Sequence, residues 1–115
     1  MKINIDGRIL VSTLVENFKK ECGGTLRVYK NNTRCDGSEK LITLATQTGT
    51  YECRLSKTVE GFEKDMKDNF GLKVQIASPD DWVLALDNMT LSNLTSIPKK
   101  ATKQDMDVLK AKYGK

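Results

Sequence analysis

The chain has 115 residues, of which 38% are hydrophobic and 30% are charged, and its formal net charge is +4. This length fits one domain with a modest core, and no apolar run approaches the roughly 18 residues of a membrane-spanning helix. The sequence contains no histidine. It therefore lacks the side chain on which catalytic triads and imidazole metal sites depend, and we expect a protein that is not an enzyme.

The net charge is concentrated at one end of the chain. Residues 1–95 contain 13 basic and 13 acidic side chains, whereas residues 96–115 contain six lysines and two aspartates. A basic segment on a neutral body can be an arm that binds nucleic acid. We favour the alternative, a lysine-rich helix face exposed to solvent.

Three cysteines, Cys22, Cys35 and Cys53, form no C-x-x-C pair and lack the further ligand that a zinc site requires. Their odd number, and a start without the apolar stretch of a secretory signal, predict reduced thiols and a cytoplasmic location. Cys35 falls in a turn-like stretch and is the one candidate for a reactive thiol.

The chain resembles itself at an offset of 48 residues. Only Val11, Lys19 and Gly23 are identical to their counterparts, but apolar positions coincide throughout. We therefore predict two tandem repeats, about residues 1–48 and 49–95. The matched apolar positions include Ile3 with Tyr51, Leu14 with Phe62, Phe18 with Met66, Leu26 with Val74, and Val28 with Ile76.

The first repeat predicts a strand, a helix and a second strand. Polar and apolar residues alternate over residues 3–5 and again over residues 25–30, which is typical of strands. Between them, Thr13 and Glu16 resemble a capping box that starts a helix, and Gly23 is suited to end it. The apolar stripe of this helix is Leu14, Val15, Phe18 and Cys22.

The second repeat predicts the same order. A strand covers residues 51–55, and Ser56 or Thr58 can cap the helix that follows. Gly71 ends this helix, and a strand over residues 72–76 comes next. The inner face of the helix is Val59, Phe62, Met66 and Phe70.

The end of the second repeat contains a turn and a tryptophan. Pro79 and the adjacent acids Asp80 and Asp81 predict a turn, which we favour over a cation site because calcium requires six to eight oxygen ligands. A lone Trp beside a turn is suited to anchor a partner protein. However, Trp82 alternates with Leu84 and Leu86, which favours a strand that buries all three side chains.

Together these elements predict an α+β fold. Two tandem βαβ(β) repeats would form a two-layer, ferredoxin-like domain with pseudo-twofold symmetry, with both helices on one face of a common sheet. A ubiquitin-like or a novel arrangement is the alternative. The domain would cover residues 1–97, followed by a basic C-terminal helix over residues 98–115. Thr102 and Asp105 cap that helix, whose apolar face is Met106, Leu109 and Tyr113.

Two segments, FGLKVQIASPDDWVLALDNMTL (residues 70–91) and TLRVYK (residues 25–30), carry a resemblance. They resemble a group of small uncharacterised bacterial proteins with a duplicated strand-helix-strand unit. In that group a helix ends in F-G-h, a V-x-h strand follows, and a D-D turn precedes a D-N-x-T-L segment. The resemblance covers about residues 1–95. It implies a duplicated α+β fold and a bacterial source, and it implies no activity.

The sequence contains no phosphate-binding loop and no metal-ligand cluster, so we predict no catalytic residue, cofactor or metal. We favour a non-catalytic protein-interaction or regulatory module of a bacterial cell or prophage, with a protein partner and no membrane association. The alternative is a nucleic-acid-binding domain that uses the sheet face and the lysine-rich C-terminal helix. The candidate interaction surface is Asp80, Asp81, Trp82, Lys99, Lys100 and Lys103.

Overall fold

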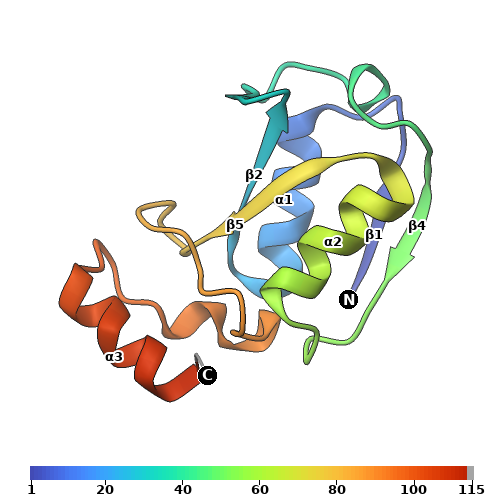
Figure 1. Ribbon diagram of the computed structural model, residues 1–115. Helices are drawn as coiled ribbons and strands as arrows, with labels where there is room; N and C mark the ends of the chain where they lie inside the picture. The colour runs from blue at the N-terminus through green and yellow to red at the C-terminus, as the bar shows by residue number, and fades with distance from the viewer. Residues whose placement is uncertain (114–115) are drawn as a thin grey trace.

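The computed structural model describes residues 1–113 (Figure 1). Residues 114 and 115, the end of the predicted C-terminal segment, lie outside the described residues. The elements confirm the predicted α+β class. In chain order they are β1 (Lys2–Ile5), α1 (Val11–Cys22), β2 (Thr25–Lys30), β3 (Thr33–Arg34), the 3-10 helix η1 (Leu41–Thr43), β4 (Gly49–Glu52), α2 (Val59–Phe70), β5 (Lys73–Ala77), the 3-10 helix η2 (Leu91–Ser96) and α3 (Lys103–Tyr113).

The strands form two small antiparallel sheets, where the sequence predicted one common sheet. β1 pairs with β4, so that Ile3 lies opposite Tyr51, and β2 lies between β3 and β5, so that Arg27 lies opposite Gln75. The two strands that α1 connects, β1 and β2, therefore do not pair with each other. Each pairs with a strand from the other half of the chain. The ferredoxin-like arrangement of two repeats stays a prediction.

The two central helices connect the sheets. In Figure 1, α1 and α2 lie between the β2–β5 pair and the β1–β4 pair. α1 packs on β1 and β2, and α2 packs on β5. The ring centroids of Phe18 and Phe62 are 5.1 Å apart, and Tyr51 meets Phe62 edge-on at 5.5 Å. These aromatic contacts join both helices and β4 in one core.

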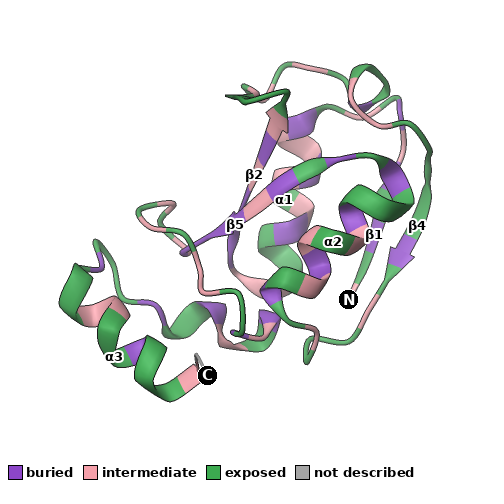
Figure 2. Cartoon of the chain, viewed as in Figure 1, coloured by how far each residue is buried: buried purple, intermediate pink, exposed green. Residues whose placement is uncertain are grey.

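Burial follows the predicted stripes closely. Figure 2 shows buried residues along α1, α2 and the strands, whereas α3 is largely exposed. All four residues of the predicted α2 stripe are buried. In α1, Leu14 and Phe18 are buried, while Val15 and Cys22 are only partly covered.

Helices α1 and α2 both end at the glycines that the sequence predicted as their ends. Gly23 and Gly71 adopt the left-handed conformation, with φ of 82° and 69°, which glycine reaches without a steric cost. At each site a side chain would also meet the other half of the chain. A Cβ on Gly23 would lie 2.7 Å from Thr95 Cγ2, and a Cβ on Gly71 would collide with Thr46.

The helix starts were predicted less well. Thr58 caps α2, because its Oγ1 accepts a hydrogen bond of 3.0 Å from the Gly61 N–H. The capping box of Thr13 and Glu16 is wrong, since α1 begins at Val11 and Leu10 occupies its N-cap without a side-chain bond.

Contacts distant in sequence satisfy the free amides at both helix starts in a similar way. In each half, the first residue of the α-helix donates a backbone hydrogen bond to the segment just before the 3-10 helix. The first residue of the 3-10 helix donates in turn to the segment just before the α-helix. These bonds run from Val11 N–H to the Glu39 carbonyl (2.7 Å), from Leu41 N–H to Ile9 (3.0 Å), from Val59 N–H to Met89 (2.8 Å) and from Leu91 N–H to Lys57 (2.9 Å).

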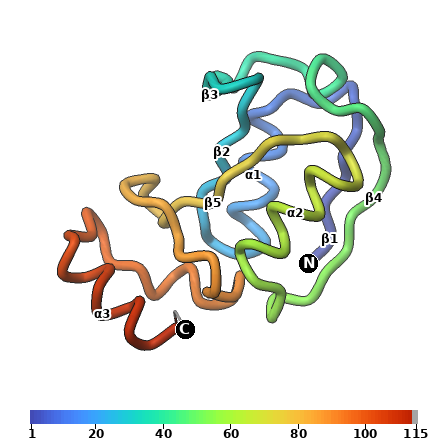
Figure 3. The backbone as a smooth tube through the Cα atoms, in the orientation of Figure 1, coloured from blue at the N-terminus to red at the C-terminus, as the bar shows by residue number. Residues whose placement is uncertain are grey.

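The C-terminal helix lies apart from α1 and α2 at the end of a long connection from β5 (Figure 3). Its predicted capping box is confirmed: the Thr102 N–H donates to Asp105 Oδ2 at 2.9 Å, and the Asp105 N–H donates to Thr102 Oγ1 at 3.2 Å. Leu109 is only 9% exposed, and Met106 and Tyr113 pack against the core cluster. The helix is therefore docked on the domain by the predicted face.

Replacing Gly23 by Ala should destabilise the protein by about 1–2 kcal/mol, because a left-handed conformation costs an L-residue about that much. The new Cβ would also lie 2.7 Å from Thr95. Thermal unfolding measures the effect. Asn69→Ala, at an exposed position in the last turn of α2, is the control and should leave the midpoint unchanged or higher, since Ala favours helix. Equal midpoints for the two variants would contradict this account.

Candidate functional site

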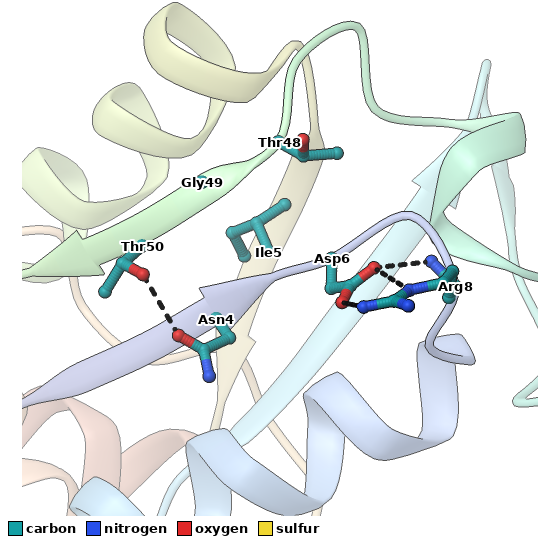
Figure 4. A pocket seen from close by; sticks show the side chains of 7 residues that line it. All are labelled: Asn4, Ile5, Asp6, Arg8, Thr48, Gly49 and Thr50. Atoms are coloured by element: carbon teal, nitrogen blue, oxygen red, sulfur yellow. Dashed lines mark hydrogen bonds and ion pairs between the residues drawn. The ribbon is translucent and has the colours of Figure 1, made fainter.

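A hollow on the β1–β4 side of the molecule has a volume of about 380 Å³ (Figure 4). Its charged groups bind each other, since Arg8 Nη2 lies 3.0 Å from Asp6 Oδ2. Thr50 Oγ1 likewise donates to Asn4 Oδ1 at 3.1 Å. Within residues 1–113, no group of three or more His, Cys, Asp or Glu side chains is placed to hold a metal ion. This hollow therefore offers little chemistry to a ligand.

Two of the three cysteines, Cys22 and Cys35, are poorly suited to act as nucleophiles. All three are free thiols. Burial raises the pKa of Cys22 to about 11 and raises that of Cys35 as well. A catalytic thiol requires a lowered pKa, so both side chains stay protonated and weakly nucleophilic near neutral pH.

The turn that follows β5 is more heavily tied to its surroundings. Ser78 is fully buried, and its Oγ donates to Asp80 Oδ1 at 2.7 Å. The same oxygen accepts hydrogen bonds from the N–H groups of Trp82 (3.0 Å) and Val83 (3.2 Å). Lys19 of α1 and Thr25 of β2 both donate to the Pro79 carbonyl. The turn is therefore held by hydrogen bonds among its own residues and by hydrogen bonds from α1 and β2.

Asp81 links this turn to the sheet. It adopts a left-handed backbone conformation, with φ of 59°, which aspartate tolerates better than most residues. Its carboxylate lies 2.7 Å from Arg27 Nε and 2.6 Å from Arg34 Nη2. Burial acts to raise the pKa of Asp81, but the hydrogen bonds from the two arginines outweigh it and lower that pKa. Both carboxylate oxygens are therefore engaged, which disfavours a cation site.

Asp80 links the turn to the C-terminal segment. The Lys100 N–H donates to Asp80 Oδ2 at 2.7 Å, and Lys100 also has a left-handed backbone, with φ of 48°. This backbone hydrogen bond, followed by the one from Ser78, lowers the pKa of Asp80. The left-handed backbone of Lys100 is thus held at the Asp80 carboxylate. Such conformations persist only where surrounding contacts hold them.

Trp82 lies on the surface of this turn. Its side chain is 58% exposed, and Lys100 Nζ lies 5.9 Å from the ring centroid. The predicted strand over Trp82, Leu84 and Leu86 is wrong, because this stretch joins the sheet only through an isolated bridge between Ala77 and Leu84. The Ser78 Oγ accepts hydrogen bonds from the Trp82 and Val83 N–H groups, which in a strand would be free to bind a neighbouring strand. The predicted burial of Trp82 is therefore also wrong.

The structure brings together four of the six predicted site residues: Asp80, Asp81, Trp82 and Lys100. Lys99 precedes Lys100 and is exposed, and Lys103 is the exposed first residue of α3. Within residues 1–113, neither Lys99 nor Lys103 forms a hydrogen bond or an ion pair with the turn. We call Trp82, Leu84, Lys99, Lys100 and Lys103 the Trp82 surface.

Sequence reasoning missed the two arginines that hold Asp81. The alternation over residues 25–30 places Arg27 on the opposite face from Leu26 and Val28, which was a usable signal. However, 54 residues separate Arg27 from Asp81. Only the pairing of β2 with β5 brings them together.

Comparisons with protein-family models, with curated proteins and with solved structures found no match to this chain. The resemblance to a group of bacterial proteins therefore stays a prediction. No helix within residues 1–113 combines the length and the apolar character needed to cross a membrane.

Replacing Asp81 by Asn should destabilise the protein by about 1–2 kcal/mol at neutral pH, because two charge-assisted hydrogen bonds to the arginines weaken. The folded-state pKa of Asp81 is lowered from 3.8, so its contribution is present above pH 3.8. The contribution is lost as pH falls through the folded-state pKa.

Urea unfolding at several pH values measures the difference between the two proteins, which should shrink in acid. Asp68→Asn is the control, because Asp68 forms an exposed ion pair with Lys64 within α2. Such a pair contributes about 0.5 kcal/mol or less. A difference for Asp81→Asn that is the same at all pH values would contradict the assignment.

Proposed function

We propose that this protein is a non-catalytic protein-interaction module and that the Trp82 surface binds its partner. The observation that carries the proposal is a Trp that is 58% exposed, on a turn where Ser78 Oγ and Asp80 Oδ1 both accept from its backbone N–H. Trp is among the residues that contribute most to binding at protein interfaces. An anchor that is ordered before binding loses less conformational entropy when the complex forms.

A duplicated fold is a further part of the proposal. We propose two repeats related by a pseudo-twofold axis in a ferredoxin-like arrangement. Both sheet pairings place equivalent residues opposite each other, 48 positions apart: Ile3 opposite Tyr51 and Arg27 opposite Gln75. Helices α1 and α2, each of 12 residues, begin and end at the same offset. An antiparallel pair centred on equivalent residues is what a twofold axis produces.

The proposal also includes a bacterial cell or prophage as the source and the cytoplasm as the location. Three free cysteines support a reducing compartment. The absence of histidine from the sequence supports a binding role over proton-transfer chemistry at neutral pH.

Nucleic-acid binding is the second candidate, and the contact between Lys100 and the exposed Trp82 ring is the observation that favours it. An exposed aromatic ring beside a lysine can stack on a base while the lysine contacts phosphate. The sheet face offers less than expected, because Tyr29 there donates to Gln75 Oε1 at 2.7 Å and Arg27 is held by Asp81. We therefore favour a protein partner.

Replacing Trp82 by Ala should weaken binding of the partner by about tenfold or more, as expected for a central aromatic anchor. The experiment is affinity purification from a native lysate with the wild type and two variants in parallel. Ile42→Ala is the matched control, because Ile42 is 67% exposed elsewhere on the molecule. One stoichiometric protein should be recovered with the wild type and the control and lost with Trp82→Ala.

Circular dichroism and thermal unfolding should show that both variants remain folded, since both side chains are exposed. Recovery of the same protein at the same level with Trp82→Ala would refute the proposal. Recovery of no partner with the wild type would count equally against it.

A further inference from the structure

The charges around Trp82 are paired unequally. Asp81 is occupied by Arg27 and Arg34, and Asp80 accepts from the Lys100 N–H and from Ser78. The acidic groups of the turn are therefore already bound within the protein. In contrast, the ammonium groups of Lys99, Lys100 and Lys103 have no carboxylate within ion-pair distance among residues 1–113.

Exposed apolar side chains lie close to one of these cations, Lys100. Trp82 is 58% exposed and Leu84 is 42% exposed, two positions apart on the same stretch. Lys100 Nζ lies 5.9 Å from the Trp82 ring, so the positive charge and the aromatic ring form one feature. A ligand that covers the ring would bring its own groups close to this ammonium.

We infer that the Trp82 surface binds an acidic segment of a partner protein that carries a bulky apolar side chain. This inference rests on the proposed function and specifies the partner by charge complementarity. The apolar side chain would pack on Trp82 and Leu84. Carboxylates on either side of it would reach the ammonium groups of Lys100 and its neighbours.

An acidic peptide fits this surface better than a nucleic acid does. A single strand is held along roughly 4–16 nucleotides by a cationic groove and several stacking rings. Trp82 is the only aromatic among the exposed large hydrophobic side chains of the described residues.

The chain contains a single Trp, so its fluorescence reports on this surface alone. The probe is the peptide acetyl-Glu-Glu-Leu-Glu-Glu-Leu-amide, titrated into the full-length protein. Its matched controls are the same peptide with Gln in place of Glu and with Lys in place of Glu. The Glu peptide should saturate the fluorescence change and shift the emission to shorter wavelength, because the ring leaves water.

The Gln peptide should bind about tenfold more weakly, since several exposed ion pairs each contribute a factor of about two to five. Rising salt concentration should weaken binding of the Glu peptide. The double variant Lys100→Gln, Lys103→Gln should lose affinity by a similar factor. Lys110→Gln with Lys112→Gln, in the last turn of α3, is the matched control and should bind as the wild type does.

Equal binding of the Glu and Gln peptides, or no fluorescence change with either, would overturn the inference. Tighter binding of an eight-nucleotide thymidine strand than of the Glu peptide would also overturn it and would favour a nucleic acid. A natural partner that is lost with Trp82→Ala but retained with Lys100→Gln, Lys103→Gln would preserve the proposed function while refuting an acidic partner.

Discussion

Antiparallel pairing between strands from opposite halves of the chain is the constraint on which the rest of the structure depends. β1 pairs with β4, and β2 pairs with β5. The two strands that α1 connects, β1 and β2, therefore do not pair with each other. The two central helices fill the space between these pairs, and the Phe18–Phe62 contact joins them. The halves also carry opposite charge, because residues 1–48 hold eight basic and five acidic side chains while residues 49–95 hold five and eight.

Local sequence signals predicted most of the elements but not how they assemble. The apolar stripe of α2, the glycine stops and the capping box of α3 depend on residues a few positions apart, and the structure has them. The start of α1 depends instead on Glu39, whose carbonyl accepts from Val11. A distant backbone group replaced the side-chain cap that the local pattern indicated.

The candidate site shows the same division between local and distant effects. Pro79 and the two aspartates predicted the turn, and within it the Asp80 carboxylate accepts a hydrogen bond from the Trp82 N–H. The alternation of Trp82 with Leu84 was misleading, because the Ser78 hydroxyl binds the amides that would have entered a sheet. The engagement of Asp81 by arginines could not be predicted, since it needs the register of β2 against β5.

The contacts at the two helix-ending glycines have a consequence for how the molecule comes apart. Gly23 leaves room for Thr95, and Gly71 leaves room for Thr46. The end of each helix therefore lies against a residue from the other half of the chain. Neither half presents a closed apolar core when the other is removed. Denaturation in a single all-or-none transition follows from this, without an intermediate in which one half survives alone.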